Sequence, residues 1–148
     1  MVDFLSPSER SERMSRIRGK DTRPELALRK VLHRLGLRYR LHGTVLPGKP
    51  DLVFPRYQAV VFVHGCFWHR HPGCSIATTP KSNTAFWVEK FEKNVARDAR
   101  VAAQLEEQGW RVLVAWECEL STPTKAIQVG EKIAIQVKAS PISKGNRP

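Results

Sequence analysis

Residues 59–74, AVVFVHGCFWHRHPGC, decide how the rest of the chain is arranged. The run 59–63 is short, rich in β-branched residues and soon followed by a glycine, so it predicts a buried strand. Three histidines, two cysteines and two large aromatic residues follow within residues 64–74. Loops that leave the carboxyl ends of strands line the crevice of open α/β sheets. The stretch therefore predicts a central strand with a functional site at its C-terminal end.

The composition indicates one domain and favours a polyanionic partner. The chain has 148 residues, of which 41% are hydrophobic, which is enough for one core. Its 25 Lys and Arg against 14 Asp and Glu give a net charge of +11, which favours nucleic acid, although a merely soluble basic protein stays open. No apolar run approaches the roughly 20 residues that span a bilayer, and the N-terminus lacks a signal-peptide pattern. We expect a cytoplasmic protein.

The two ends of the chain differ in composition from its centre. Ser6, Pro7 and Glu9 form a helix-start pattern, and arginines dominate the helix predicted up to about Gly19. We interpret residues 1–20 as a basic helix or arm, either solvated or docked on the phosphates of a nucleic acid. Residues 121–148 are interpreted as a C-terminal extension, with a helix over 124–138 and a disordered tail from 140.

The central residues 21–120 carry the pattern of an α/β core. Thr22 and Glu25 form a capping box at the start of a helix that ends at Gly36. Next come an edge strand over 37–42, a hairpin that pairs 52–54 with 59–63, a long helix over 86–108 and a strand over 110–116. A strand reached through a helix is typically parallel to an earlier one. Together the elements predict a single α/β domain with a central mixed sheet flanked by helices.

Two charged features of this core need partners. Asp51 lies at the start of an apolar strand, where a carboxylate is costly unless it is paired or bound to a metal ion. On the long helix, Lys90, Lys93 and Arg97 recur three and four residues apart with Asn94 beside them. That basic ridge is interpreted either as a solvated face or as a surface for nucleic acid. Glu25, judged from its local sequence, is a capping carboxylate.

The cysteines and histidines predict a metal site. Cys66, His71 and Cys74 are closely spaced, and Cys118 follows the strand over 110–116. Three sulfurs and one imidazole form a closed tetrahedral set that suits structural Zn²⁺. This assignment leaves His64 and His69, which are either ordinary surface or core residues or groups available for chemistry beside Asp51.

The order of these motifs resembles two nuclease groups. Pro50-Asp51 followed by a hairpin is similar to the PD-(D/E)xK nuclease core, a restriction-endonuclease-like fold, but Phe62-Val63-His64 stands where Glu-x-Lys is expected. A closer resemblance, from about Arg10 to Cys118, is to the very-short-patch mismatch-repair endonucleases. It rests on PGKPDLV at 47–53, HGCFWH at 64–69, the FWxEK segment and the KN and RD pairs of 86–98, and the GWRV and WEC segments of 109–118. Members of that family nick one strand 5′ to the thymine of a T:G mismatch.

The resemblance implies roles for the residues of the site. Asp51 and the backbone carbonyl of Val63 would bind Mg²⁺, with valine standing where threonine is expected. His69 would act as general base, His64 would assist at the phosphate, and Glu25 would contact the water shell of the metal. The zinc ligands would be Cys66, His71, Cys74 and Cys118. Pro72-Gly73 gives one residue more than expected before Cys74, which leaves His69 as a rival zinc ligand.

The resemblance also implies how DNA would be bound. Three aromatic residues, Phe67, Trp68 and Trp87, would wedge between base pairs from the major groove, and Met14 would enter from the minor groove. The side chains of Lys90, Lys93, Asn94 and Arg97 would contact bases or phosphates. A nick in one strand needs one active site, so we expect a monomer, with mismatch-repair proteins as further partners.

Two other functions stay open at this point. The first is a nickase or endonuclease of the same scaffold that cuts another lesion, mismatch or fixed sequence. The second is a zinc-containing DNA-binding module without catalysis. A carboxylate at Asp51 would repel DNA phosphate unless a metal ion lies between them, which favours a nuclease over the binding module.

Overall fold

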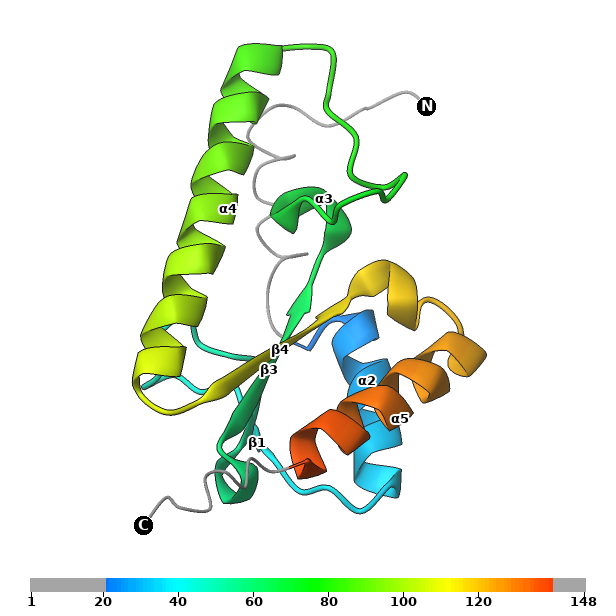
Figure 1. The fold of residues 1–148 in the computed structure, drawn as a ribbon. Helices are drawn as coiled ribbons and strands as arrows, with labels where there is room; N and C mark the ends of the chain where they lie inside the picture. Colours follow the sequence, from blue (N-terminus) through cyan, green and yellow to red (C-terminus); the bar gives the residue numbers. More distant parts are fainter. Residues whose placement is uncertain (1–20, 140–148) are drawn as a thin grey trace.

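The computed structural model describes residues 21–139 (Figure 1). The predicted basic arm over 1–20, with Met14, and the predicted tail from 140 onward lie outside these residues. None of the helices within 21–139 combines the length and the apolarity that a membrane crossing requires.

A four-stranded mixed sheet forms the centre of the fold. Its strand order is β1 (Arg40–Leu41), β2 (Leu52–Phe54), β3 (Ala59–His64) and β4 (Arg111–Trp116). The first three strands pair antiparallel, with Leu52 opposite Val61, and β4 pairs parallel to β3, with Val63 opposite Ala115. The predicted hairpin, the parallel fourth strand and the mixed α/β sheet are confirmed, while the edge strand is shorter than the predicted 37–42.

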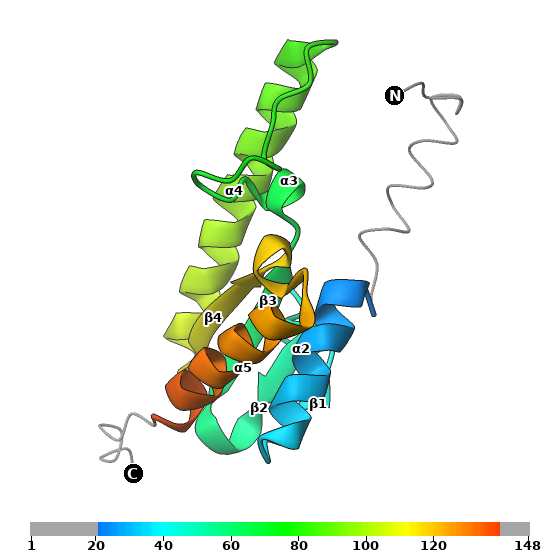
Figure 2. The same cartoon turned by 90° about the vertical axis from the view of Figure 1, so that its right-hand side faces the viewer.

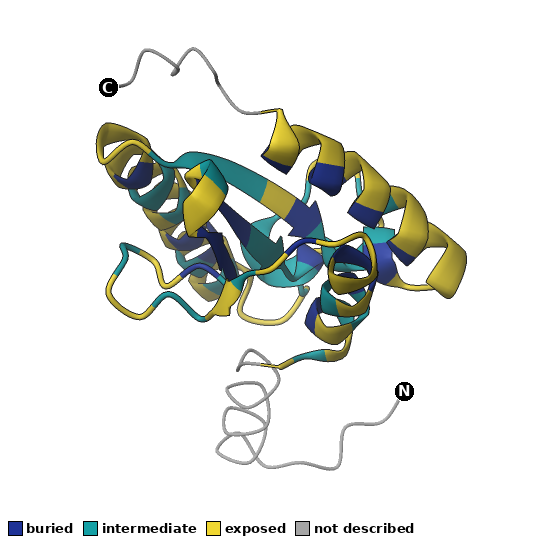
Figure 3. Cartoon of the chain, turned by 90° about the horizontal axis from the view of Figure 1, so that it is seen from below, coloured by how far each residue is buried: buried dark blue, intermediate teal, exposed yellow. Residues whose placement is uncertain are grey.

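Helices cover both faces of the sheet. On one face lie α2 (Arg23–Arg34) and α5 (Pro123–Lys138), and on the other lies α4 (Thr84–Glu107) (Figures 1 and 2). The larger core fills the space between the sheet and the α2–α5 pair, and a smaller one around Val60 and Leu105 lies under α4. Figure 3 shows buried residues on the helix surfaces that face the sheet. The helix α2 begins as predicted, since Thr22 Oγ1 accepts a hydrogen bond from the Glu25 amide at 3.4 Å.

The helix α5 is part of the core, which differs from its interpretation as an extension. Five of its residues are buried, namely Ala126, Gly130, Ile133, Ala134 and Val137. Gly130 lets the two helices approach closely, because a Cβ atom built on it would lie 2.9 Å from the Cβ of Val31 on α2. The composition of this segment did not indicate that one face of the helix is apolar and packs on α2.

We expect Gly130→Ala to lower the free energy of unfolding by about 1–3 kcal/mol, because the added methyl overpacks the contact with Val31. Alanine in a solvated helix interior would instead stabilise by about 1 kcal/mol. Gln128→Ala, at an exposed position of the same helix, is the control. Urea unfolding of the two variants checks the prediction, and a Gly130→Ala protein more stable than wild type would contradict the close packing.

The helix α4 extends well beyond the sheet at its N-terminal half, where it runs beside the short helix α3 (Cys66–His69) (Figure 1). The apolar stripe of α4, which includes Val88, Phe91, Val95 and Leu105, is therefore only partly covered. Phe91 and Leu105 are buried, but Val88 and Val95 are 41% and 45% exposed. The apolar residues of α4 do recur with the 3.6-residue period of a helix, but the sheet is too narrow to cover the whole helix.

Candidate active site

Asp51 lies one residue before β2, beside the end of β3. Its Oδ2 accepts a hydrogen bond from the amide of Val63 at 2.7 Å, so this backbone group is the partner that the acidic residue required. Burial raises the pKa of Asp51 to about 6, partly offset by the bond from Val63, and nearby Glu25 raises it further. The surroundings therefore compensate little of the negative charge of this carboxylate, so a cation beside it is favoured.

Glu25 is buried in the first turn of α2, with only 2% of its surface exposed. Its Oε1 accepts from the amide of Asp21 at 3.1 Å, and its Oε2 lies 2.9 Å from His42 Nε2 and also accepts from Arg29. Glu25 therefore combines the predicted capping role with a place in a charged cluster near Asp51. The helical capping box differs in detail, because the Glu25 carboxylate bonds to Asp21 instead of Thr22.

His64, the last residue of β3, and His69, the last residue of α3, lie face to face. Their ring centroids are 3.8 Å apart with an interplanar angle of 7°. Nδ1 of His69 lies 2.7 Å from Oδ2 of Asp98 on α4. Burial, followed by the neighbouring His69, lowers the pKa of His64 to about 4, while Asp98 raises it. His64 is therefore a neutral imidazole at physiological pH, and His69 has a carboxylate partner.

These groups line one cleft, of about 920 Å³, between the sheet and α4. Its polar wall contains Asp51, Val63, His64, His69 and Asp98, and its apolar wall includes Phe62, Val112 and Val114. This set of five residues is called the active-site cleft below. A carboxylate, a neutral imidazole and an Asp–His pair in one cleft can hold a metal ion, donate to an anion and accept a proton.

The predicted zinc ligands form a separate cluster. One ligand atom each from Cys66, His71, Cys74 and Cys118 lies within 4.8 Å of the others. His71 Nδ1 is 3.6 Å from the sulfur of Cys66 and 3.4 Å from that of Cys118, whereas His69 is turned to Asp98. Of the two candidate fourth ligands, the structure brings His71 into the cluster. The donor set of three thiols and one imidazole is that of a closed tetrahedral site for Zn²⁺.

Several contacts hold this cluster in shape. The Cys66 amide donates to Glu117 Oε1 at 2.9 Å, and the His71 ring stacks on Trp116 with centroids 4.2 Å apart. Burial raises the pKa of the Cys66 thiol to about 12. Such a thiol ionises readily only beside a cation, which agrees with a metal-binding role.

The aromatic residues predicted to enter DNA gather where α3 meets α4. Phe67 and Trp68 on α3 have ring centroids 5.1 Å apart, and Trp68 lies 5.9 Å from Trp87 on α4. All three are half-buried, and Phe86, which the sequence did not single out, is 58% exposed beside Trp87. The structure thus brings together three of the four predicted intercalating residues, and Met14 lies outside the described residues.

The basic ridge of α4 is divided between exposed and buried positions. Lys93 and Arg97 are exposed and Lys90 is half-buried. Asn94, predicted to contact DNA, is only 7% exposed, and its side-chain amide donates to the carbonyl of Trp68 at 3.1 Å. Asn94 therefore lies on the face of α4 that packs on α3 and supports the aromatic cluster, and its contact with DNA stays a prediction.

Arg70 joins the loop that follows α3 to the helix α4, and no sequence motif indicated this role. Its guanidinium donates to the carbonyls of Phe67 at 3.1 Å, Ala77 at 2.9 Å and Thr78 at 3.0 Å. It also lies 3.8 Å from the centroid of the Phe91 ring. Arg70 therefore fixes the loop that follows α3 next to the aromatic cluster.

Comparison with known proteins identifies the family of this chain. A family model described as DNA mismatch endonuclease Vsr matches residues 2–75. The chain belongs to the Vsr family of DNA mismatch endonucleases. As a member of the Vsr family it is a DNA endonuclease, and the resemblance seen in the sequence is confirmed.

Three Vsr relatives cover most of the chain. Type II nicking enzyme V.XorIIP of Xanthomonas oryzae pv. oryzae is 54% identical over 82% of this chain and 88% of its own length. Type II nicking enzyme V.NmeAIP of Neisseria meningitidis is 48% identical over 81% of this chain and 85% of its own. DNA mismatch endonuclease Vsr of Escherichia coli is 45% identical over 81% of this chain and 76% of its own.

Proposed function

We propose that this chain is a Mg²⁺-dependent, strand-specific endonuclease that nicks DNA 5′ to the thymine of a T:G mismatch, in very-short-patch mismatch repair. The observation that carries the proposal is the convergence of Asp51, His64 and the His69–Asp98 pair on one cleft. The names of the relatives, which include nicking enzymes and a mismatch endonuclease, support the same reaction.

The residues of the cleft fit a Mg²⁺ ion. Carboxylate and carbonyl oxygens are the ligands that Mg²⁺ takes, and we assign this role to Asp51 and the carbonyl of Val63. A carbonyl ligand tolerates valine at this position because it belongs to the backbone. A bound Mg²⁺ would activate water and neutralise charge on the scissile phosphate. Glu25, buried near Asp51, is assigned to the water shell of the ion.

Proton transfer is assigned to His69. Its Nδ1 is engaged with Asp98, which fixes the ring and leaves Nε2 to accept the proton of the attacking water. That water forms a new P–O bond as the bond from phosphorus to the leaving oxygen breaks. His64 is neutral because its pKa is lowered to about 4, so it can donate a hydrogen bond to a phosphate oxygen without carrying charge.

Zinc would give this site its rigidity. Cys66 belongs to α3, Cys74 to the loop beyond it and Cys118 to the segment after β4, so one ion would fix α3 and its loop against the end of β4. The aromatic cluster and His69 are carried by the same short helix and its partner α4. We propose that this placement aims Phe67, Trp68 and Trp87 at the base stack, where unstacking is least costly at a mismatch.

We expect Cys118→Ser to lose zinc and much of the stability that it provides, since structural Zn²⁺ contributes about 10–16 kcal/mol in zinc-finger peptides. Zinc content by elemental analysis and the midpoint of thermal unfolding check this, with Ser75→Ala, at an exposed position beside Cys74, as the control. A Cys118→Ser protein with unchanged zinc content and midpoint would contradict the four-ligand site.

A panel of end-labelled duplexes tests the substrate. The panel contains the T:G mismatch, other mismatches and matched pairs in one sequence context, with Mg²⁺. Cleavage beside the thymine of T:G alone supports the proposal. Equal cleavage of other mismatches or of matched sites would retain the nuclease and reject T:G specificity. A single cleft that cuts one strand also leads us to propose a monomer, with mismatch-repair proteins as further partners.

A further inference from the structure

Four rings form a continuous column from the predicted zinc cluster to the histidine assigned as general base. The His71 ring stacks on Trp116, with centroids 4.2 Å apart and an interplanar angle of 9°. Trp116 meets His64 edge to face, with centroids 5.3 Å apart and an angle of 72°. His64 in turn stacks on His69 at 3.8 Å. The indole of Trp116 therefore lies between the two sites, in contact with a residue of each.

Strand pairing holds Trp116 beside His64. These residues end β4 and β3, and they are partners in the parallel register, so their side chains leave the same face of the sheet. The amide of Trp116 also donates to Glu119 Oε1 at 3.0 Å, which fixes the main chain where β4 ends. Trp116 lines the 920 Å³ cleft together with His64 and His69. The contact between the indole and His64 is thus built into the sheet.

The orientation of His64 is set by ring contacts. Within residues 21–139 its imidazole makes no hydrogen bond or ion pair. Its neighbours are Phe62, with centroids 5.6 Å apart, and the rings of His69 and Trp116. His69 differs, because a carboxylate of α4 holds it through a hydrogen bond. A hydrogen bond from His64 to a phosphate oxygen is directional, so the packing around this ring decides whether that bond can form.

We propose that Trp116 positions the two histidines of the active-site cleft, and that its contact with His71 ties their placement to the zinc cluster. This inference rests on the proposed function and deepens it. Trp116 acts through His64, so it is a positioning residue. Without the indole, His64 loses one of its three ring contacts and can turn away from the phosphate. A shift of about 1 Å in a catalytic group can reduce a rate about 100-fold.

Trp116→Leu in the zinc-loaded full-length protein is the first test. Leucine keeps an apolar side chain and removes the ring. We expect kcat for nicking a T:G duplex to fall at least about tenfold with KM unchanged, because the orientation of His64 is lost while the DNA-binding residues stay in place. Trp116→Phe restores a ring at this position and should keep kcat within about threefold of wild type.

His71→Cys tests the other end of the column. Four cysteines form a closed zinc site, as three cysteines and one histidine do, and the variant is assayed with Zn²⁺ added until the site is filled. The change removes the imidazole on which the indole lies, so kcat should fall at least about threefold although zinc is bound. A wild-type kcat in zinc-loaded His71→Cys protein would reject the coupling of Trp116 to the cluster.

Trp110→Leu is the matched control. It makes the same change in the residue that precedes β4, at the end of the strand away from His64, where the indole packs against the smaller core. We expect a lower midpoint of thermal unfolding but a wild-type kcat. An equal loss of kcat in folded Trp110→Leu protein would overturn the role of Trp116, because the loss would then follow from a weaker core.

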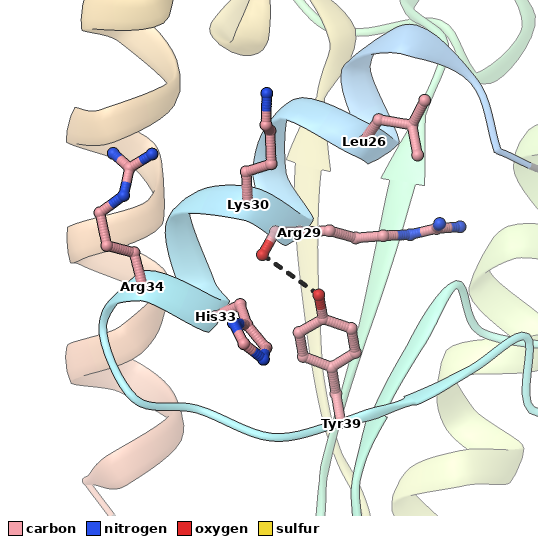
Figure 4. A pocket seen from close by; sticks show the side chains of 6 residues that line it. All are labelled: Leu26, Arg29, Lys30, His33, Arg34 and Tyr39. Carbon is pink, nitrogen blue, oxygen red and sulfur yellow. Dashed lines mark hydrogen bonds between the residues drawn. The ribbon is translucent and has the colours of Figure 1, made fainter.

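The ring protons of His69 give a readout that does not depend on catalysis. Stacking places them in the ring current of His64, which shifts their NMR resonances, whereas in the described part of the chain Trp116 has ring contacts with only His64 and His71. The His69 resonances should therefore move in Trp116→Leu because His64 has moved, and should return in Trp116→Phe. His33 is the internal reference, since its ring lines a separate hollow on α2 (Figure 4).

The positioning role and the proposed function can fail separately. Folded, zinc-loaded Trp116→Leu protein with wild-type kcat or wild-type His69 resonances would overturn the role of Trp116. Moved His69 resonances in a protein whose wild type does not nick DNA would retain that role and reject the proposed function. Circular dichroism shows whether each variant is folded, and Trp116→Met serves if Trp116→Leu is not. If neither folds, Trp116 is a core residue and the positioning role is rejected.

Discussion

Asp51→Ala should retain the affinity of the protein for a T:G duplex and nick it at least about 10³-fold more slowly. Metal-ion stabilisation of charge in the transition state is worth several kcal/mol, and about 4 kcal/mol corresponds to that factor. Removing a carboxylate next to the DNA backbone does not weaken binding, because the carboxylate repels phosphate when no metal lies between them. Single-turnover nicking and equilibrium binding on the same duplex measure the two effects.

Glu131→Ala is the control for Asp51→Ala. It removes an exposed carboxylate on α5, on the face of the sheet opposite α4. An Asp51→Ala protein that nicks at the wild-type rate would contradict the metal site. Unchanged binding with no cutting would instead exclude a zinc-containing module that only binds DNA, because such a module makes no use of Asp51.

The raised pKa of Asp51 also affects the Mg²⁺ requirement. Burial raises this pKa to about 6, and only the ionised carboxylate binds the ion. As the pH falls through 6, protons compete with Mg²⁺, so the Mg²⁺ concentration for half-maximal nicking should rise. Above pH 7 the carboxylate is ionised and that concentration should become insensitive to pH.

His69→Ala should reduce the rate of nicking by about 10²–10⁴-fold, the usual contribution of a general base. Asp98→Asn should cause a smaller loss, because His69 keeps its ring but loses the carboxylate that orients it and stabilises its protonated form. The separate values of kcat and KM distinguish this positioning role from a structural one. With Asp98→Asn the loss should fall on kcat, while KM for the duplex stays at the wild-type value, because Asp98 orients the base and does not contact the DNA.

The controls for this pair lie on the same helix. Glu92→Gln changes an exposed carboxylate of α4 that lies outside the active-site cleft, and it should leave kcat and KM unchanged. A wild-type kcat in Asp98→Asn would contradict the role of Asp98 in orienting His69. Full activity in His69→Ala would reject His69 as the base.

The parts of the fold that sequence predicted well depend on local signals. Thr22 caps α2, the apolar runs of β2 and β3 form the hairpin, and the helix between β3 and β4 makes those strands parallel. The cysteines and the histidine of the Cys66 cluster were likewise recognisable from the sequence, because grouped thiols and imidazoles are typical metal ligands. Each of these predictions depends on residues that are close in the chain or on the chemistry of a residue type.

The features that could not be predicted from the sequence depend on tertiary packing. No sequence pattern paired Asp98 with His69, which lies 29 positions earlier in the chain. No sequence pattern indicated a role for Arg29 or His42, because their common partner is the buried carboxylate of Glu25 on the first turn of α2. The bond from Asn94 to the carbonyl of Trp68 likewise depends on how α3 packs on α4.

The most direct test of the account is a nicking assay on a T:G duplex with each strand labelled separately, run with Mg²⁺ and with a chelator, beside the matched duplex. The account predicts one cut, on the thymine strand 5′ to the mismatched T, only with Mg²⁺ and not in the matched duplex. Cleavage of both strands, cleavage in the chelator, or no cleavage by zinc-loaded protein that binds the duplex would contradict it.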